Sequence, residues 1–391
     1  MHVLVVPSWY PTTEAPLLGI YFAEQARCLA RNGVQVGVVY PEQQSLRRAS
    51  WDALREKHFQ TEWTDEQGVP TLRRYGWNVW WRFPPGLRCR VRSAVRLAHR
   101  YVDRHGVPDL IHAQSGRWAG AAAARISRSF SVPFALTEHF TGFQRDSIFP
   151  WRWSVIEEGY RHTSGIAAVS TALKHTLATN DLAPASRIDL HPNLAPTSFF
   201  SLPPTLRPIP PPLHFVTVAR LVPQKNVGGL LRAFATATEH ASDATLTVVG
   251  DGPERAPLEQ YARKLGIADR VSFRGQLNRE GVRDALWNAH ALVLPSHHET
   301  FGVVLLEAMA TGLPVVATAS GGPEDIVTPT TGRLVPPDDT EALADALLQM
   351  IASWPSYDAS AIRQYTLDHY GPEPFVRRTR LLYSRALERA R

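Results

Sequence analysis

The sequence is poor in features that mark several protein classes. Only two of its 391 residues are cysteines, Cys28 and Cys89, and neither has the spacing of a metal ligand, so neither a disulfide framework nor a zinc site is expected. The first apolar run, residues 3–6, ends at Pro7 without a basic stretch before it, which argues against a signal peptide. No Asp-x-Asp pair occurs that could hold a divalent metal. We therefore expect a cytoplasmic protein with neither metal nor cofactor.

The composition is that of a folded protein with more than one domain. With 44% apolar and 20% charged residues, neither disorder nor a bundle of membrane helices is expected. The length exceeds that of one ordinary core, and the six prolines within 201–213 predict a linker. We expect domains at 1–200 and 214–365, and a C-terminal helical segment at 366–391 that can pack back on the first domain.

Short β-branched runs alternate with helical patterns in both halves. Strands are expected at residues 3–6, 34–40, 109–114, 134–139, 165–170, 214–219, 245–250, 271–275, 291–296 and 314–320. Helices are expected near residues 19–32, 118–128, 227–239, 254–265, 340–353 and 374–391. This alternation predicts two doubly wound α/β units with parallel sheets. Ligands bind outside the carboxyl ends of such strands, so two units facing one another are expected to form a cleft.

Positive charge is concentrated in one segment. Residues 71–105 contain nine arginines and a single acid, Asp103, and Trp77, Trp80, Trp81 and Phe83 precede most of the arginines. This mixture suits an anionic membrane surface, while a solvated helix face with core aromatics is the alternative. Nucleic acid is not expected as a partner, because no recognisable binding module accompanies the patch.

The stretch HHETFGVVLLEAMATGLPVVAT, residues 297–318, places two glutamates around a helix start. A helix beginning near Phe301 and Gly302 presents unpaired amides at the positive end of its dipole, which suits phosphate. Val303 and Glu307 share a face, so Glu307 can reach from a diphosphate to a ribose diol. Glu299 suits sugar hydroxyls, since phosphate would repel it. Two solvated glutamates beside a core helix are the structural alternative.

Two cations precede a helix in the same half of the chain. Arg220 and Lys225 lie five positions apart in ARLVPQKN, after the strand expected at 214–219. They match the charge of a nucleoside diphosphate ester, and their interaction strengthens as charge develops on the leaving group. Such a pair makes a divalent metal unnecessary.

These motifs together resemble glycosyltransferase family 4, retaining enzymes of the GT-B fold with two Rossmann-like domains. The resemblance covers ARLVPQKN, VVGDGPE at 248–254, FRGQL at 273–277, and ETFGVVLLE with the following PVVA and GGPEDIV. It implies that Arg220 and Lys225 hold the donor diphosphate, Glu307 the ribose and Glu299 the transferred sugar. It also implies donor contacts from Gly250, Arg274, Leu277 and the backbone of Phe301, Gly302 and Val303.

The first half resembles the family more loosely. PSWYPTTEAPLLGIYFAEQA, residues 7–26, is similar to the start of members that build bacterial envelope and exported polysaccharides. There the resemblance implies that Gly19 lets the chain approach the diphosphate, and that His139 in FALTEHF faces donor sugar and acceptor. An ordinary turn glycine and a structural histidine are the alternatives.

Some positions depart from the family pattern. Asn226 follows Lys225 where glycine is common, and Leu194 replaces the glycine of Pro-Asn-Gly, which puts the local turn in doubt. VVGDGPE lacks the third glycine of a dinucleotide fingerprint, so a nicotinamide enzyme is not expected.

The sequence thus predicts a retaining hexosyltransferase-type enzyme. We expect a UDP- or GDP-sugar as donor and, as acceptor, a saccharide that is lipid-linked at the inner face of a membrane. The alternatives are a transferase for a small soluble acceptor, a nucleotide-sugar epimerase of GT-B architecture, and a non-catalytic nucleotide-sugar-binding subunit of a polysaccharide assembly complex.

Overall fold

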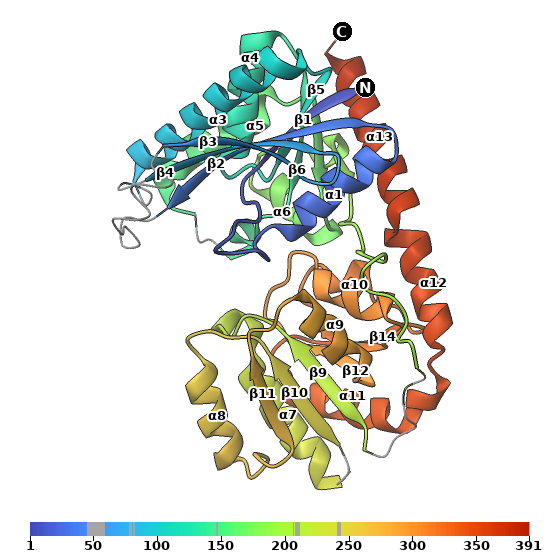
Figure 1. Ribbon diagram of the computed structural model, residues 1–391. Coiled ribbons are helices and arrows are strands. Elements are labelled where there is room, and N and C mark those ends of the chain that lie inside the picture. Colours follow the sequence, from blue (N-terminus) through green and yellow to red (C-terminus); the bar gives the residue numbers. More distant parts are fainter. Residues whose placement is uncertain are drawn as a thin grey trace. The chain divides into compact units, whose positions relative to one another are not determined.

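Runs of β-branched residues form the central strands of two separate sheets. The computed structural model describes residues 1–44, 59–77, 80, 83–145, 148–205, 207, 212–240 and 244–390. They divide into two units, Met1–Leu194 with Phe375–Arg391, and Ala195–Pro374. The domain limits expected at 200 and 365 stay predictions. Each unit is α/β, with one sheet covered by helices (Figure 1).

The first unit contains an eight-stranded sheet in the order β3-β4-β2-β1-β5-β6-β7-β8. Its central strand β1 is buried along its whole length, as the early apolar run predicts. The strands are β1 (His2–Pro7), β2 (Gln35–Gln44), β3 (Thr61–Asp65), β4 (Pro70–Trp77), β5 (Leu110–Gln114), β6 (Phe134–Glu138), β7 (Gly165–Ala168) and β8 (Ile188–Leu190). The helices are α1 (Ile20–Arg31), α3 (Pro84–His105), α4 (Ala119–Phe130), α5 (Pro150–His162) and α6 (Thr171–Thr179), with 3-10 turns η2 (Thr141–Arg145) and η3 (Ala185–Arg187).

The edge of this sheet differs from the parallel arrangement expected. β3 pairs antiparallel with β4, while β4 pairs parallel with β2. The reversal follows from the short turn between β3 and β4, in which Gln67 and Gly68 take φ values of 61° and 85°. A tight turn with positive φ at both central residues joins antiparallel strands.

The second unit contains a six-stranded sheet in the order β11-β10-β9-β12-β13-β14, all of whose pairings are parallel. Its strands are β9 (His214–Val218), β10 (Thr245–Val249), β11 (Val271–Gly275), β12 (Ala291–Leu294), β13 (Val315–Thr318) and β14 (Gly332–Val335). Its helices are α7 (Val227–His240), α8 (Arg255–Lys264), α9 (Arg279–Trp287), α10 (Val303–Ala310), α11 (Thr340–Ser353) and α12 (Ala359–Tyr370), with 3-10 turns η4 (Pro223–Lys225), η5 (Pro323–Asp325) and η6 (Trp354–Ser356). The chain ends in α13 (Pro372–Arg389).

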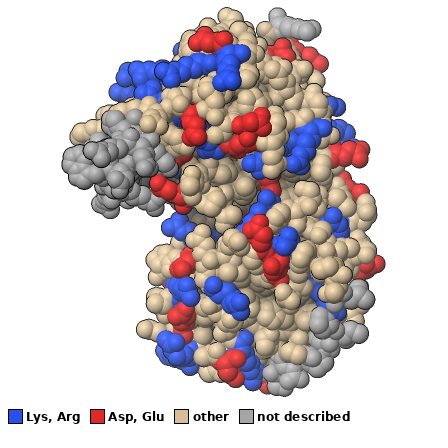
Figure 2. Space-filling view, viewed as in Figure 1, with Lys and Arg blue, Asp and Glu red and all other residues tan. Residues whose placement is uncertain are grey.

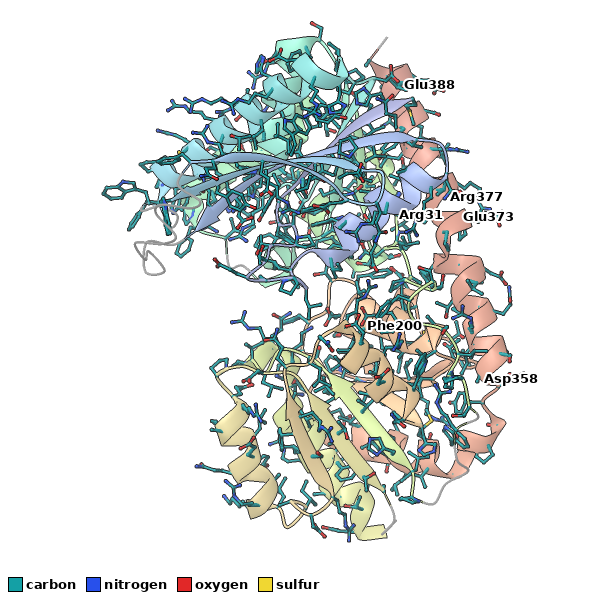
Figure 3. The ribbon with its side chains drawn as sticks, viewed as in Figure 1. Arg31, Phe200, Asp358, Glu373, Arg377 and Glu388 are labelled. Carbon is teal, nitrogen blue, oxygen red and sulfur yellow. The ribbon has the colours of Figure 1, made fainter. Side chains whose placement is uncertain are left out.

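Helix α12 begins at a side-chain cap and binds the start of the second unit through an arginine. The side chain of Asp358, labelled in Figure 3, accepts hydrogen bonds from the amides of Ser360 (2.8 Å) and Ala361 (3.2 Å). One turn later, the Arg363 guanidinium donates to the carbonyl of Phe200 at 2.9 Å, and the Phe200 ring is buried. α12 therefore fixes the first residues of the second unit.

The arginine-rich segment forms the end of β4 and helix α3. Trp80 and Phe83 are more than half exposed, whereas Trp77 is half-buried. Trp81 and Arg82 lie outside the described residues. Within the described ranges, no helix combines the length and the apolar character needed to cross a membrane.

Helix α13 packs on buried histidines of the first unit. The Tyr383 hydroxyl lies 2.8 Å from Nδ1 of His112, and the Thr379 hydroxyl lies 2.8 Å from Nε2 of His191. Burial lowers the pKa of His112 to about 3 and that of His191 to about 4, from an ordinary value of 6.5. Both rings are therefore neutral in the folded protein near pH 7.

We predict that acid destabilises the first unit through these two rings. Below about pH 6.5 these histidines bind protons in the unfolded chain but stay neutral in the folded chain. The folded state is therefore most stable above about pH 6.5, and its stability falls as the pH is lowered toward 4. At pH 5.5 the loss is about 1.4 kcal/mol for each histidine. Urea unfolding of the protein and of His112→Asn at several pH values measures it. An identical pH dependence in the two proteins would contradict the prediction.

Candidate active site

The loop after β9 carries the two cations expected to hold a diphosphate. Arg220 is exposed, and its side chain pairs with no carboxylate among the described residues. Lys225 ends the turn η4 and is half-buried. Asn226 then takes φ 48°, and its side chain accepts a hydrogen bond from the Gly229 amide at 3.1 Å. Because asparagine tolerates this left-handed conformation, the departure from glycine leaves the loop intact.

Lys225 and Glu299 form an ion pair although they are 74 positions apart. The Lys225 ammonium lies 2.5 Å from Oε2 of Glu299, and the Ser296 hydroxyl donates to the same oxygen at 3.2 Å. The side chains are 21% and 15% exposed, so the pair is screened from water on most sides. Parallel pairing of β9 with β12 explains the proximity, because both residues follow carboxyl ends of adjacent strands.

The backbone around Glu299 is fixed by a second loop. The Glu299 amide donates to the carbonyl of Ser320 at 2.9 Å, and its carbonyl accepts from the Gly322 amide at 2.7 Å. Gly322 packs so closely that a Cβ there would lie 2.2 Å from Cα of Phe301. The GGPEDIV segment therefore positions the acidic loop, a role that the motif order alone does not reveal.

Helix α10 begins at the Phe-Gly pair as expected. Gly302 is its N-cap with φ 97°, a conformation that favours glycine. The Phe301 ring is buried and packs edge-on against Tyr370 at 6.1 Å, so only its backbone is left for a ligand. Val303 and Glu307 are half-buried on a helix whose other face is fully buried. Helix α10 thus carries both the amides of its first turn and the Glu307 side chain, the two groups expected to bind diphosphate and ribose.

The remaining second-unit residues lie along the same edge of the sheet. Gly250 has φ 136°, and a Cβ there would lie 1.8 Å from the Ala219 carbonyl oxygen, so the β10 turn rests on the Arg220 loop. Its amide donates to the Gly275 carbonyl at 2.8 Å, which joins it to the end of β11. Arg274 is exposed and Leu277 is half-buried at that end. The loops after β11, β10, β9 and β12 therefore form one continuous rim.

In the first unit, Gly19 is the N-cap of α1. Its φ is 70°, and a Cβ there would lie 2.7 Å from the carbonyl oxygen of Trp9. A side chain is therefore excluded by the loop that follows β1. Leu194 stands where the family pattern has the glycine of Pro-Asn-Gly. Its φ is not positive and its side chain is buried, so this position does not form a turn that needs glycine.

His139 lies at the end of β6 within a buried polar network. Its Nε2 lies 2.7 Å from the Gln114 side-chain oxygen, and Gln114 donates to Gln25 at 3.3 Å, which donates to Asn193 at 3.0 Å. The ring packs edge-on against Phe22 at 4.8 Å. Burial, with smaller contributions from two buried histidines, holds the pKa of His139 well below its ordinary value of 6.5. His139 is thus a neutral imidazole.

Glu138, for which the sequence predicts no role, organises this end of the sheet. Its carboxylate is fully buried, and Oε1 accepts from the Ser115 hydroxyl and from the amides of His139 and Phe140, each at 2.8 Å. Oε2 accepts from the Gly116 amide at 2.7 Å and from the Tyr160 hydroxyl at 2.6 Å. Burial and the adjacent carboxylate raise the pKa of Tyr160. Position at a parallel strand end was the only available signal.

The structure thus brings the expected residues together in two groups. Arg220, Lys225, Glu299, Gly302 and Glu307 share the rim of the second sheet, while Gly19 and His139 share the carboxyl end of the first. Each group belongs to a separate unit.

Two family models match the chain in sequence order. The model described as Glycosyltransferase Family 4 matches residues 18–199, and the model described as Glycosyl transferases group 1 matches residues 207–366. The TuaC glycosyltransferase of Bacillus subtilis, named for teichuronic acid biosynthesis, is 28% identical over 89% of this chain and 88% of its own. The 2-deoxystreptamine N-acetyl-D-glucosaminyltransferase of Streptomyces fradiae is 30% identical over 67% of each.

Solved structures share the fold over nearly the whole chain. Sucrose-phosphate synthase from Thermosynechococcus elongatus has a TM-score of 0.77 at 21% identity, covering 99% of this chain and 100% of that one. HepE of Anabaena, solved in complex with UDP, has a TM-score of 0.71 at 19% identity, covering 98% and 100%. The fold is therefore GT-B.

We predict that Glu138→Gln destabilises the first unit and displaces His139. The amide nitrogen of glutamine meets hydrogen-bond donors on either side, so the free energy of unfolding should fall by about 2–4 kcal/mol. Urea unfolding measures the loss. Glu157→Gln, which removes an exposed carboxylate whose ion pair among the described residues is with Arg161, is the matched control and should change stability by less than about 0.5 kcal/mol. Equal stability of the two variants would refute a bracing role for Glu138.

Proposed function

The chain belongs to glycosyltransferase family 4, and from this premise we propose that it transfers a sugar from a nucleoside diphosphate sugar to a saccharide hydroxyl with retention of configuration. The second unit binds the donor nucleotide and the first binds the acceptor. The observation that carries the proposal is the Lys225–Glu299 pair beside the exposed Arg220 and the start of α10.

The chemistry of these groups supports diphosphate as the leaving group. Negative charge grows on the diphosphate as the glycosidic bond breaks, so Arg220 and Lys225 bind the transition state more tightly than the ground state. The amides of Gly302 and Val303 add the positive end of a helix dipole. Two fixed cations can supply the neutralisation for which other transferases use a divalent metal, so we propose a reaction without metal or cofactor.

The two glutamates have complementary tasks in this proposal. Glu307 holds the ribose diol and Glu299 holds hydroxyls of the transferred sugar. Glu299 is kept in place by Lys225 until the donor arrives. The donor is a UDP- or GDP-sugar, and the neighbour HepE, crystallised with UDP and with UDP-glucose, supports the nucleoside diphosphate class.

Retention fits a front-face reaction. The buried carboxylate beside the acceptor side, Glu138, already accepts five hydrogen bonds and has no exposed surface, so it is not available as a nucleophile. The departing phosphate oxygen then takes the acceptor proton as the new glycosidic bond forms. His139, neutral because of its burial, can donate or accept a hydrogen bond without adding charge.

The acceptor is a lipid-linked saccharide of polysaccharide or glycolipid synthesis at the cytoplasmic face of a membrane. The similarity to TuaC, named for teichuronic acid biosynthesis, supports a polymer of the envelope or an exported polysaccharide. The arginines of α3 and the exposed Trp80 and Phe83 support peripheral contact with anionic lipid. An epimerase is not favoured, because the relatives described above are glycosyltransferases.

We predict that Lys225→Ala lowers the turnover of sugar transfer by about 100- to 1,000-fold, the size of losing one preorganised partner for developing charge. Steady-state transfer from the UDP- and GDP-sugars to a lipid-linked saccharide acceptor measures it. Lys264→Ala removes the same charge from an exposed position on α8 and should leave turnover unchanged. Normal turnover in Lys225→Ala would overturn the assignment of the diphosphate site.

A further inference from the structure

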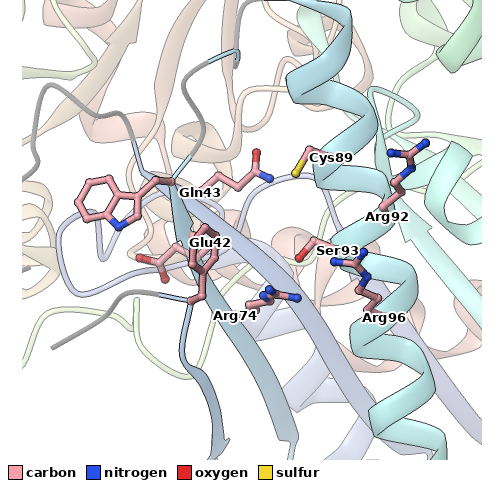
Figure 4. Close-up of a pocket in the computed structure, with 10 residues that line it drawn as sticks. Glu42, Gln43, Arg74, Cys89, Arg92, Ser93 and Arg96 are labelled. Carbon is pink, nitrogen blue, oxygen red and sulfur yellow. The ribbon is translucent and has the colours of Figure 1, made fainter. Parts of the chain in front are cut away.

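A cavity of about 350 Å³ opens in the first unit beside α3. From the strands, Glu42 and Gln43 of β2 and Arg74 and Gly76 of β4 line it. From α3, Cys89, Arg92, Ser93 and Arg96 line it, and Cys89 and Ser93 lie on the side of the helix toward the strands (Figure 4). Trp77 and Phe59 complete its wall. Its volume is in the range of small-ligand sites.

The charge of this cavity is strongly positive. Three arginines are among its lining residues, Arg74, Arg92 and Arg96, against one acidic residue, Glu42. Arg92 and Arg96 lie four positions apart on α3, where like charges destabilise a helix. Both are exposed, and neither pairs with a carboxylate in the part of the chain that the structure describes. An anion in the cavity would relieve this repulsion.

The arginine side chains are also part of a wider basic surface. Lys and Arg gather over α3 in the space-filling view (Figure 2). Arg88 and Arg100 continue the four-residue spacing of Arg92 and Arg96, but neither lines the cavity. Arg100 instead donates to the Thr61 hydroxyl at 2.9 Å. The cavity is therefore a concave site within a larger basic surface, and Arg100 belongs to that surface but not to the cavity.

The position of the cavity connects it with the acceptor side of the reaction. β2 is parallel to both β1 and β4, so the carboxyl ends of these strands lie at one edge of the sheet. His139 follows β6 and Gly19 follows β1 at the same edge. With strands about 4.8 Å apart, β4 is separated by about 10 Å from β1, which precedes Gly19, and by about 19 Å from β6, which precedes His139, a span that a saccharide of several sugars covers. An acceptor can therefore reach both places.

We propose that this arginine pocket binds a phosphate or diphosphate group of the acceptor, which deepens the proposed function and rests on it. Planar guanidiniums donate paired hydrogen bonds that match phosphate oxygens. The indole of Trp77 and the ring of Phe59 give the charged site an apolar wall, which suits a phosphate that joins a saccharide to a lipid. The pocket then fixes the anionic group while the saccharide extends toward His139.

Cys89 provides a direct measurement of occupancy. It is exposed in the pocket, whereas the other cysteine, Cys28, is buried, so alkylation by iodoacetamide reports on the pocket. Inorganic diphosphate, or vesicles of phosphatidylglycerol in contrast to phosphatidylcholine, should slow the alkylation of Cys89. Protection by inorganic diphosphate would show that the pocket binds a soluble phosphate group. Protection by the anionic vesicles alone would show that it binds a lipid headgroup. Either result supports the proposal. Unchanged alkylation with both would overturn it.

Matched variants separate a built pocket from general charge. Arg92→Ser and Arg96→Ser should each raise the ligand concentration for half-protection by about tenfold, the effect of one charge-assisted hydrogen bond. Arg100→Ser removes the same charge from the same helix outside the pocket and should change it by about twofold or less. An equal effect of Arg100→Ser would contradict the proposal. Cys89→Ser should abolish the signal.

The outcome is separable from that of the proposed function. Lys225→Ala, which should lower the turnover of sugar transfer by about 100- to 1,000-fold, alters a residue of the second unit, so Cys89 of this variant should be protected as in the unchanged protein. Protection in a protein that transfers no sugar under any condition would retain the pocket and refute the proposed function. Loss of transfer in Lys225→Ala without any protection of Cys89 would support the proposed function and refute the arginine pocket.

Discussion

The ion pair between Lys225 and Glu299 is the interaction on which the candidate site depends. It joins the loop after β9 to the loop after β12, at adjacent carboxyl ends of parallel strands. Neither side chain would be stable alone with so little exposure, since an unpaired charge removed from water is costly. The pair therefore holds a cation and an acid side by side beside the start of α10. In the proposed reaction the diphosphate replaces Glu299 as the partner of Lys225, and Glu299 turns to sugar hydroxyls.

Backbone packing keeps this arrangement rigid. Gly250 lies against the Ala219 carbonyl and Gly322 against the backbone of Phe301, in each case too closely for any side chain. Gly302 supplies the left-handed conformation that starts α10. In the first unit a buried carboxylate provides the rigidity, because Glu138 accepts hydrogen bonds from three segments of the chain. A preorganised polar frame of this kind stabilises developing charge without having to rearrange.

Much of the second unit could be predicted from its sequence, and less of the first. β-branched runs and start and stop signals located β9 to β13, and the Phe-Gly pair located the start of α10, because these depend on local propensity and chain order. The β3–β4 hairpin is local, but its turn holds Gln67 at positive φ, a conformation that its residue type does not indicate. The pairing of His112 with Tyr383 joins residues 271 positions apart, which no local pattern encodes. Glu138 and the arginine pocket were missed as sites because burial and concavity appear only after folding. The sequence of residues 71–105 indicates a basic and aromatic segment, but the pocket that three of its arginines line appears only in the folded chain.

The most direct measurement is a crystal structure of the protein with a bound nucleoside diphosphate, UDP in one crystal and GDP in another. The account predicts the diphosphate within hydrogen-bonding distance of the Arg220 guanidinium, the Lys225 ammonium and the first amides of α10, with the ribose at Glu307. A nucleotide bound elsewhere, with Arg220 and Lys225 directed into solvent, would contradict it.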